Sequence, residues 1–187
     1  MKAIDGTQGL TQLEEAQRIV LESTPILGLE KISILDALGR VLGEDIVADR
    51  DNPPWDNSAM DGFAVRWEDI KQEHAIQKTV TLTVIEDVAA GKMPSKSVGA
   101  GQAIRIMTGA PLPKGADTVL KVEDTEHTPD SVRVFKSEPQ GANIRPQGED
   151  VKKGECIIGK GTQIRPGEAG MLAILAKSFI FAYQRPR

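Results

Sequence analysis

The chain contains 187 residues, of which 40% are hydrophobic and 27% charged, and its formal net charge at pH 7 is −4. This composition predicts a globular protein of one large or two small domains and excludes a disordered chain. The acidic balance and the scattered Lys and Arg residues argue against nucleic-acid and membrane-surface binding. With a single cysteine, no apolar N-terminal signal and no apolar run of membrane-spanning length, we expect a cytoplasmic protein.

The first predicted element is an amphipathic helix at 12–23. Its apolar residues recur at helical spacing, and Thr11 with Glu14 matches a capping box at its start. Its apolar stripe has no evident helical partner in the next hundred residues. Three shorter elements follow: a strand at 32–34, a helical turn at 35–40 and a strand at 44–48.

Residues 56–145 have mostly the patterns of strands. Apolar residues alternate with threonines at 80–84, as in a half-buried strand. Further short strands are predicted at 103–107, 117–122 and 132–135. Turns rich in glycine and proline separate them, and this spacing favours a small β-rich unit.

The residue pattern changes after residue 148, where glycines typical of turns alternate with short apolar segments. Pro166 is suited to the first position of a helix, and Glu168 in the first turn complements the helix dipole. The segment FIFAYQRPR at the C-terminal end alternates like a strand.

Familiar catalytic signatures are missing from the sequence. There is no glycine-rich phosphate loop of the Walker or dinucleotide type. The two histidines, His74 and His127, are isolated in polar segments, which argues against a His-based metal site or a Ser-His-Asp triad. Cys156 has no histidine nearby, so we expect a buried small hydrophobic residue rather than a nucleophile.

Carboxylates on loops remain as candidates. A single Asp beside a Gly is most often a turn residue that bonds nearby backbone. Three stretches, however, each combine a short strand, a glycine-containing turn and a polar group where the strand meets the turn: DNSAMDGFAVR (56–66) with Asp61, RIMTGAPLP (105–113) with Thr108, and NIRPQGEDV (143–151) with Arg145 and Asp150. Binding and catalysis concentrate on such loops.

The chemistry of these groups suits a phosphorylated ligand. Arg145 offers a planar fork of donors for phosphate, and the carboxylates of Asp61 and Asp150 could hold a hard cation such as Mg²⁺. The residues themselves therefore predict a phosphate and cation site.

Four segments occur in this order: PPWDNSAMDGFAVR, RIMTGAPLP, GADTVLKVED and NIRPQGEDVKKGE. In sequence and spacing they closely resemble the molybdopterin molybdenumtransferase family, which comprises the MoeA proteins and the gephyrin E domain. The resemblance covers nearly the whole chain. It implies a transferase of molybdenum cofactor biosynthesis that inserts the substrate molybdate into adenylylated molybdopterin and releases AMP, with Mg²⁺ as cofactor. It also implies a MogA-type adenylyltransferase as the upstream enzyme and a homodimer.

The resemblance also assigns roles to residues by position. It implies catalytic roles for Asp61 and Asp150, with both carboxylates as Mg²⁺ ligands. The residues it implies in substrate binding are Ser58, Thr108, Glu123 and Arg145. Phe63 stands where many members have Tyr, which removes one hydroxyl group.

The fold implied is mainly β with a few helices, in two lobes like the N-terminal region of MoeA, with a β-rich insertion domain. The expected parts are an N-terminal helix in 1–25 that packs on a further α/β domain, an elongated lobe of 26–49 plus 147–178, the insertion domain at 50–146, and a linker at 179–187. Family members continue into that molybdate-binding α/β domain about where this chain ends. We therefore expect residues 1–187 to fold but not to catalyse the reaction alone.

Two alternatives to the enzyme stay open. The chain could be a non-catalytic scaffold module of the gephyrin type, or a half-protein that completes its site with a separate partner. The DNSAM form of the first motif resembles the bacterial enzymes and favours catalysis. The sequence does not decide between molybdenum and tungsten.

Overall fold

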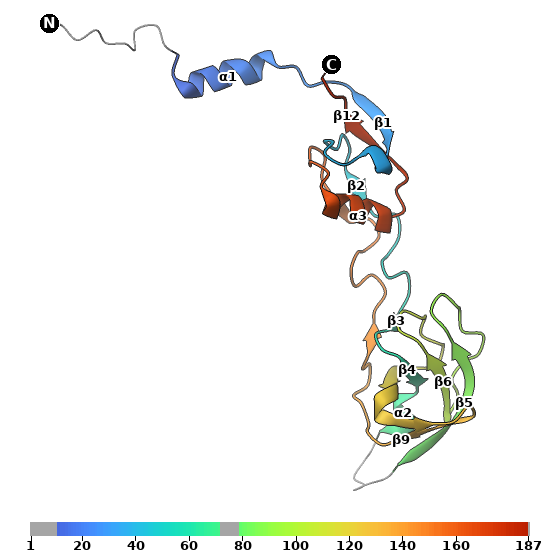
Figure 1. The fold of residues 1–187 in the computed structure, drawn as a ribbon. Coiled ribbons are helices and arrows are strands. Elements are labelled where there is room, and N and C mark those ends of the chain that lie inside the picture. Colours follow the sequence, from blue (N-terminus) through green and yellow to red (C-terminus); the bar gives the residue numbers. More distant parts are fainter. Residues whose placement is uncertain (1–10, 72–78, 187) are drawn as a thin grey trace, which may run out of the picture. The chain divides into compact units, whose positions relative to one another are not determined.

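The computed structural model describes residues 11–71 and 79–186, so His74 lies outside the described residues. The chain divides into two compact units (Figure 1). One contains the described residues up to Ile46 and from Ile158 onward, and the other is Val47–Ile157. The described residues form mainly strands with three α-helices, which confirms the predicted fold class.

The first unit begins with helix α1 (Leu13–Ser23), as the apolar spacing predicted. The predicted capping box is wrong, because Gln12 is the N-cap and no side chain caps the helix. None of the residues of α1 is buried within this chain. No helix in the described ranges has the length and apolar character needed to cross a membrane.

The core of the first unit forms around a strand pair. Strand β1 (Leu29–Ser33) pairs antiparallel with β12 (Phe179–Tyr183). The 3₁₀ turn η1 (Ile34–Asp36) follows β1 along the chain. The predicted linker at 179–187 therefore contains a strand, in which Ile180 and Ala182 alternate as buried residues. Helix α3 (Pro166–Ile174) starts at Pro166 as predicted and buries Leu172.

The second unit contains a six-stranded sheet in the order β7-β4-β6-β5-β9-β8, curled as Figure 1 shows. Only the β5–β6 pair is parallel within this sheet. The strands are β4 (Gly62–Val65), β5 (Val80–Val88), β6 (Gln102–Ile106), β7 (Thr118–Lys121), β8 (Thr125–His127) and β9 (Ser131–Val134). Helix α2 (Trp67–Ile70) follows β4, and the 3₁₀ turn η2 (Val122–Asp124) joins β7 to β8.

Two further pairs of short strands flank this sheet in the chain. Strand β3 (Asn57–Ser58) pairs with β10 (Ile144–Arg145), and β2 (Ile46–Val47) pairs with β11 (Cys156–Ile158). The side chain of Cys156 is exposed, so the prediction that it is a buried hydrophobic residue is wrong.

Residues 147–157 belong to the sheet unit, whereas the sequence grouped 147–178 with the other lobe. The reason is a set of hydrogen bonds to the segment before β3. Asp51 accepts from the backbone N–H of Lys153 at 2.8 Å, and the backbone of Asn52 both donates to and accepts from Val151. These bonds fix the returning chain to the outgoing one.

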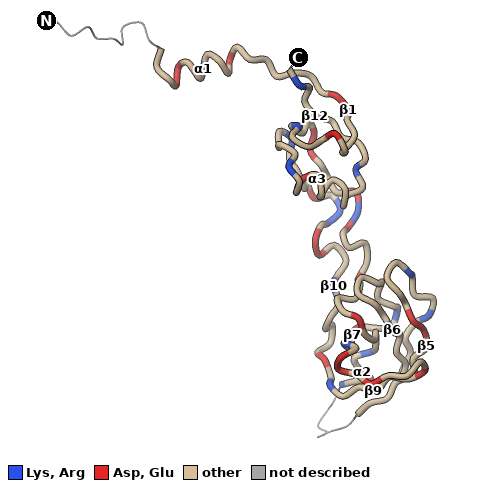
Figure 2. The backbone as a smooth tube through the Cα atoms, viewed as in Figure 1, with Lys and Arg blue, Asp and Glu red and all other residues tan. Residues whose placement is uncertain are grey.

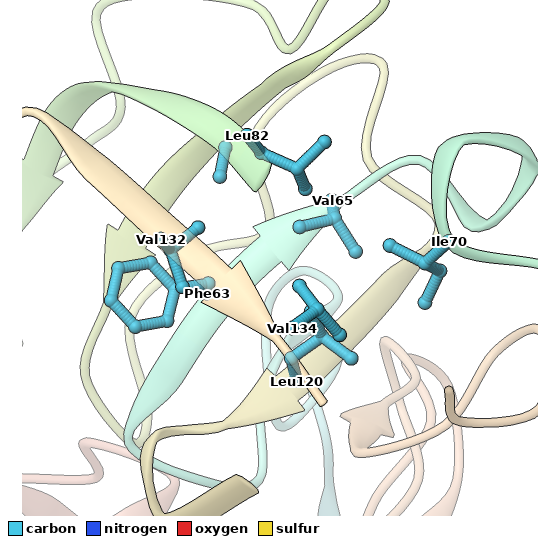
Figure 3. Close-up of a cluster of buried hydrophobic side chains, with 8 residues drawn as sticks. Phe63, Val65, Ile70, Leu82, Leu120, Val132 and Val134 are labelled. Atoms are coloured by element: carbon cyan, nitrogen blue, oxygen red, sulfur yellow. The ribbon is translucent and has the colours of Figure 1, made fainter. Parts of the chain in front are cut away.

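Buried side chains cover both faces of the six-stranded sheet. Strand β4 is buried along its whole length, which explains why GFAV is continuously small or apolar instead of alternating. Figure 3 shows one of the two clusters, with Phe63 and Ile70 at opposite ends. The other contains Ala64, Ile104 and Ile106. The sheet is therefore a rigid support for the loops at its ends.

Gly62 opens β4 at a point where two backbones approach closely. A Cβ atom at this position would lie 1.7 Å from the carbonyl oxygen of Leu120 on β7. Only glycine lets β7 pair here, so the glycine of the DNSAMDG stretch is required by packing rather than by a special backbone angle.

Candidate functional site

The candidate site lies at the end of the sheet where β4 begins and β6 and β7 end. Gly62 pairs with Ile106 on one side and with Lys121 on the other. The next residues along each strand are therefore neighbours beyond this edge, and they carry Asp61, Thr108 and Glu123. Three of the motif segments thus meet at one edge because of the strand register.

Asp61 and Thr108 are joined directly. Oδ1 of Asp61 accepts from the backbone N–H of Thr108 at 2.8 Å and from its hydroxyl at 2.7 Å. The two hydrogen bonds from Thr108, assisted by the positive charge of Arg105, lower the pKa of Asp61 from its ordinary value. The carboxylate of Asp61 is thus ionised at neutral pH and lies on the exposed side of the loop.

The fourth segment joins this edge through the β3–β10 pair. Ser58 pairs with Ile144 and Asn57 with Arg145, and the backbone N–H of Gly109 donates to the carbonyl of Ser58 at 2.8 Å. Ser58 therefore bridges the loop after β6 and the segment that carries Arg145.

The Ser58 side chain itself serves the loop. It is fully buried, and its hydroxyl donates to the carbonyl of Met60 and accepts from the Met60 N–H. The resemblance implied substrate binding, but in this geometry the hydroxyl is not exposed to a ligand. Glu123, by contrast, is exposed, and its neighbour Val122 donates a backbone hydrogen bond to the Asp61 carbonyl.

Arg145 is engaged by two carboxylates of its own loop. Its Nε donates to Glu149 at 2.8 Å, and its Nη2 lies 2.8 and 2.9 Å from the two oxygens of Asp150. The hydrogen bonds that Arg145 donates, to Glu149 first and to Asp150 second, raise the pKa of Arg145. The predicted phosphate-binding arginine is thus partly neutralised, and binding an anion would require it to share or exchange these partners.

Two acidic residues that support the site were not among the predicted site residues. Asp56 accepts from the backbone N–H of Gln147 at 2.7 Å, and Asp51 accepts from the Gln147 side chain at 2.7 Å. Both hold the loop that follows Arg145 against the loop that precedes Asp61. Their positions on either side of the Pro-Pro pair were visible in the sequence. Their hydrogen-bond partner Gln147, however, lies far away along the chain.

The donor set fits Mg²⁺ only in part. Within 11–71 and 79–186 there is no cluster of three or more His, Cys, Asp or Glu side chains that could hold a metal ion. Asp61 could supply one oxygen ligand, and protein-bound Mg²⁺ often uses one or two carboxylates together with phosphate oxygens of the substrate. Asp150 fits this role less well, because the guanidinium of Arg145 already compensates its charge.

Charged residues elsewhere are dispersed. Figure 2 shows Lys and Arg interspersed with Asp and Glu in each unit, without a long basic run in the described residues. The electrostatic character of the site is therefore local and comes from the groups at this sheet edge.

Comparison with known proteins gives a consistent result. Residues 11–176 match the family model described as the MoeA N-terminal region (domain I and II). The chain is 36% identical over 178 residues to the molybdopterin molybdenumtransferase of Bacillus subtilis, covering 93% of this chain and 41% of the relative. It is 37% identical over 178 residues to molybdopterin molybdenumtransferase 2 of Mycobacterium tuberculosis, covering 95% of this chain and 44% of the relative.

A solved structure agrees with the sequence comparison. The crystal structure of the molybdopterin biosynthesis moeA protein from Pyrococcus horikoshii OT3 is similar with a TM-score of 0.85 and 39% identity. The match covers 92% of this chain and 46% of that one. The chain therefore spans less than half the length of these relatives.

Proposed function

This chain belongs to the MoeA family, whose N-terminal region it matches, and from this premise we propose that it is the N-terminal part of a molybdopterin molybdenumtransferase. The proposed reaction of the whole protein inserts molybdate into adenylylated molybdopterin and releases AMP, as a cytoplasmic step of molybdenum cofactor biosynthesis. The further parts of the proposal are a homodimer and a MogA-type adenylyltransferase that supplies the adenylylated substrate.

The observation that carries the proposal is the meeting of the four motif segments at one edge of the sheet. Asp61 and Thr108 are hydrogen-bonded there, and the β3–β10 pair brings the Arg145 loop beside them. Thr108 holds the ionised carboxylate of Asp61 in position through Oδ1, and the carboxylate remains exposed to a ligand.

We propose the following roles, which the family resemblance implies and which this geometry supports. Asp61 would supply one oxygen ligand to Mg²⁺, which would neutralise phosphate charge of the substrate when bound. Thr108 holds Asp61 in place and keeps it ionised. Arg145 binds the anionic substrate through its guanidinium, with Asp150 and Glu149 orienting it. Glu123 is an exposed polar group beside Asp61 that can contact the substrate.

The test uses a chimera. This chain replaces the matching N-terminal region of the Bacillus subtilis relative, and AMP release from adenylylated molybdopterin is measured with molybdate, with tungstate and without oxyanion, each with Mg²⁺. The baseline is the relative that lacks its N-terminal region. We expect molybdate-dependent AMP release well above the baseline, and the tungstate measurement identifies the preferred oxyanion.

A chimera that is folded and dimeric yet releases no AMP above the baseline would contradict the proposal. That result would favour the non-catalytic scaffold module, whose dimerisation does not require the reaction. Circular dichroism and sedimentation of the chimera separate this outcome from simple misfolding.

A further inference from the structure

A hollow of about 570 Å³ opens beside Phe63 in the sheet unit, separate from the Asp61–Thr108 contact. Strands β4, β5 and β6 contribute to its wall, together with the segment 127–130 that joins β8 to β9. Phe63 ends the buried cluster of Figure 3, so the hollow extends the apolar core towards solvent. Its volume falls in the range of ~300–1,000 Å³ that is usual for small-ligand sites.

One wall of the hollow is aromatic. The rings of Phe63 and His127 lie 5.4 Å apart between centroids, at an interplanar angle of 58°. Phe63 is fully buried, whereas His127 is exposed. A planar ring of a ligand can therefore stack on the exposed His127 ring, which Phe63 contacts from the core side.

The remaining wall combines carboxylates and a guanidinium. Arg105 donates to Asp87 at 3.2 Å, and the exposed Asp130 lies in the same wall. Glu86 also lines the hollow, but its oxygens accept from Ser95 and from the backbone of Lys96. The groups left to meet a ligand are therefore the Asp87–Arg105 pair and Asp130.

A β-bulge creates this arrangement. Val84 pairs with Ala103 but Glu86 pairs with Ile104, so Ile85 is an extra residue in β5. Regular pairing would have placed Glu86 opposite Arg105. The bulge instead places Asp87 there, and bulges of this kind are frequent next to functional sites, where they redirect a side chain.

The hollow adjoins the Asp61 edge through the same strands. Arg105 pairs with Phe63 across β4 and β6, one position from the Gly62–Ile106 pair at which the site begins. The charge of Arg105 also contributes, after the larger effect of Thr108, to the lowered pKa of Asp61. A ligand with its ring in the hollow can therefore extend a phosphate group towards Asp61.

We propose that this hollow is the subsite for the pteridine ring of the substrate, an inference that rests on the proposed function. The ring stacks on His127, whose own ring contacts the buried Phe63. The carboxylates of Asp87 and Asp130 accept hydrogen bonds from the amino group and ring N–H of its 2-amino-4-oxopyrimidine edge. Arg105 donates to the neighbouring carbonyl.

The same chemistry disfavours adenine, the other ring of an adenylylated substrate. The pairing edge of adenine offers one amino donor beside ring nitrogens that are acceptors. A carboxylate repels these acceptors, whereas a pteridine edge presents two adjacent donors to it. The adenylyl group is therefore placed outside the hollow.

Every described residue that lines the hollow belongs to the sheet unit of this chain, so binding can be measured on this chain itself. The probe is pterin-6-carboxylic acid, whose intrinsic fluorescence reports binding, with AMP added as competitor. We expect saturable one-to-one binding that AMP does not displace. Asp130→Asn and His127→Ala should each weaken it by at least ~10-fold, because a charge-assisted hydrogen bond or a stacking surface is lost.

Glu126→Gln is the matched control. Glu126 precedes His127 but pairs with Arg133 and does not line the hollow, so this variant should bind the pterin as the original chain does. All three changed residues are exposed, and equal melting temperatures verify that each variant is folded. Absence of pterin binding, displacement by AMP, or unchanged affinity in both Asp130→Asn and His127→Ala would overturn the proposal.

The two proposals fail separately. Molybdate-dependent AMP release by the chimera together with unchanged pterin affinity in the hollow variants would leave the function standing and remove this subsite. Pterin binding that needs Asp130 and His127, with no AMP release by the folded chimera, would leave a pterin-binding module without the transferase reaction.

Discussion

The loop that carries Asp61 and the loop that carries Asp150 present the same chemical group in different settings. Asp61 accepts hydrogen bonds from the neutral donors of Thr108 and keeps its negative charge. Both oxygens of Asp150 face the guanidinium of Arg145, which compensates that charge within the loop. The difference indicates that Asp61 is suited to a cation or a reacting group, whereas Asp150 is suited to orienting Arg145.

The two loops also differ in what fixes them. The Asp61 loop is continuous with β4, whose pairing requires the close approach at Gly62. The Asp150 loop is held to the segment before β3 by a few backbone hydrogen bonds, such as that from the Asp150 N–H to the Asn52 carbonyl, and by the carboxylates of Asp51 and Asp56. The first should therefore depend on the sheet and the second on a few hydrogen bonds.

The largest expected effect comes from breaking the support of the Asp61 loop. Gly62→Ala forces a Cβ into the Leu120 carbonyl, so β7 must move away from β4. We expect the free energy of unfolding to fall by more than about 3 kcal/mol, at the upper end of overpacking costs. Urea unfolding measures it. Gly167→Ala is the control, because its Cβ would meet no atom within 4 Å; equal losses in both variants would contradict the argument.

Removing the charge of Asp61 tests its chemical role. In the chimera, Asp61→Asn should reduce the rate of AMP release at least ~10-fold, while the melting temperature stays nearly unchanged because the residue is exposed. Asp45→Asn is matched to it, since Asp45 likewise accepts a backbone N–H, from Lys160 at 2.7 Å, and should retain the original rate. A large loss of stability in Asp61→Asn with a normal rate per folded molecule would assign Asp61 to the fold.

The role of the other loop is tested by Arg145→Lys. An ammonium group cannot reproduce the fork that meets Glu149, Asp150 and a phosphate, so affinity for adenylylated molybdopterin should fall about 10-fold. Titration of the chimera measures this affinity. Arg165→Lys provides the control, because Arg165 is held by Glu168 in the same manner in the other unit. If Arg145→Lys binds the substrate normally, Arg145 serves only to hold its own loop.

The smallest expected effect concerns Glu168, a carboxylate that Arg165 binds outside the candidate site. Hydrogen bonds from Arg165, then from backbone N–H groups, lower the pKa of Glu168 from 4.5 to about 2 in the folded chain. Its contribution to stability is complete above about pH 4.5 and is lost as the pH falls towards about 2. Glu168→Gln should flatten the stability curve in that window, and parallel curves for the two proteins in urea unfolding would contradict this.

Much of the fold was predictable because its signals are local. The alternation at 80–84 marked β5, and Pro166 with Glu168 marked the start of α3. The capping box at Thr11 failed although its pattern was present, since helix α1 begins one residue later, after Gln12. The two-residue strands β3 and β10 carry no period that a sequence pattern could reveal.

The candidate site was predictable as a set of residues but not as a geometry. Asp61, Thr108 and Arg145 were found from their motifs, while the hydrogen bond between Asp61 and Thr108 follows from the register of β4 and β6. The two carboxylates that bind Arg145 lie only four and five residues further along the chain, so these ion pairs could have been predicted from the sequence. The bulge at Ile85 could not be predicted, because the alternation of apolar and polar residues in β5 does not indicate an extra residue.

The β3–β10 pair has a kinetic consequence. It joins only two residues on each side, and the paired segments are separated by the entire six-stranded sheet along the chain. Contacts so distant in sequence form after the local ones, because the entropy of closing the loop must be offset first. Folding should thus complete the sheet before the Arg145 segment docks, and on warming this segment should open while the sheet is still intact. The proposed activity is therefore expected to disappear at a lower temperature than the fold.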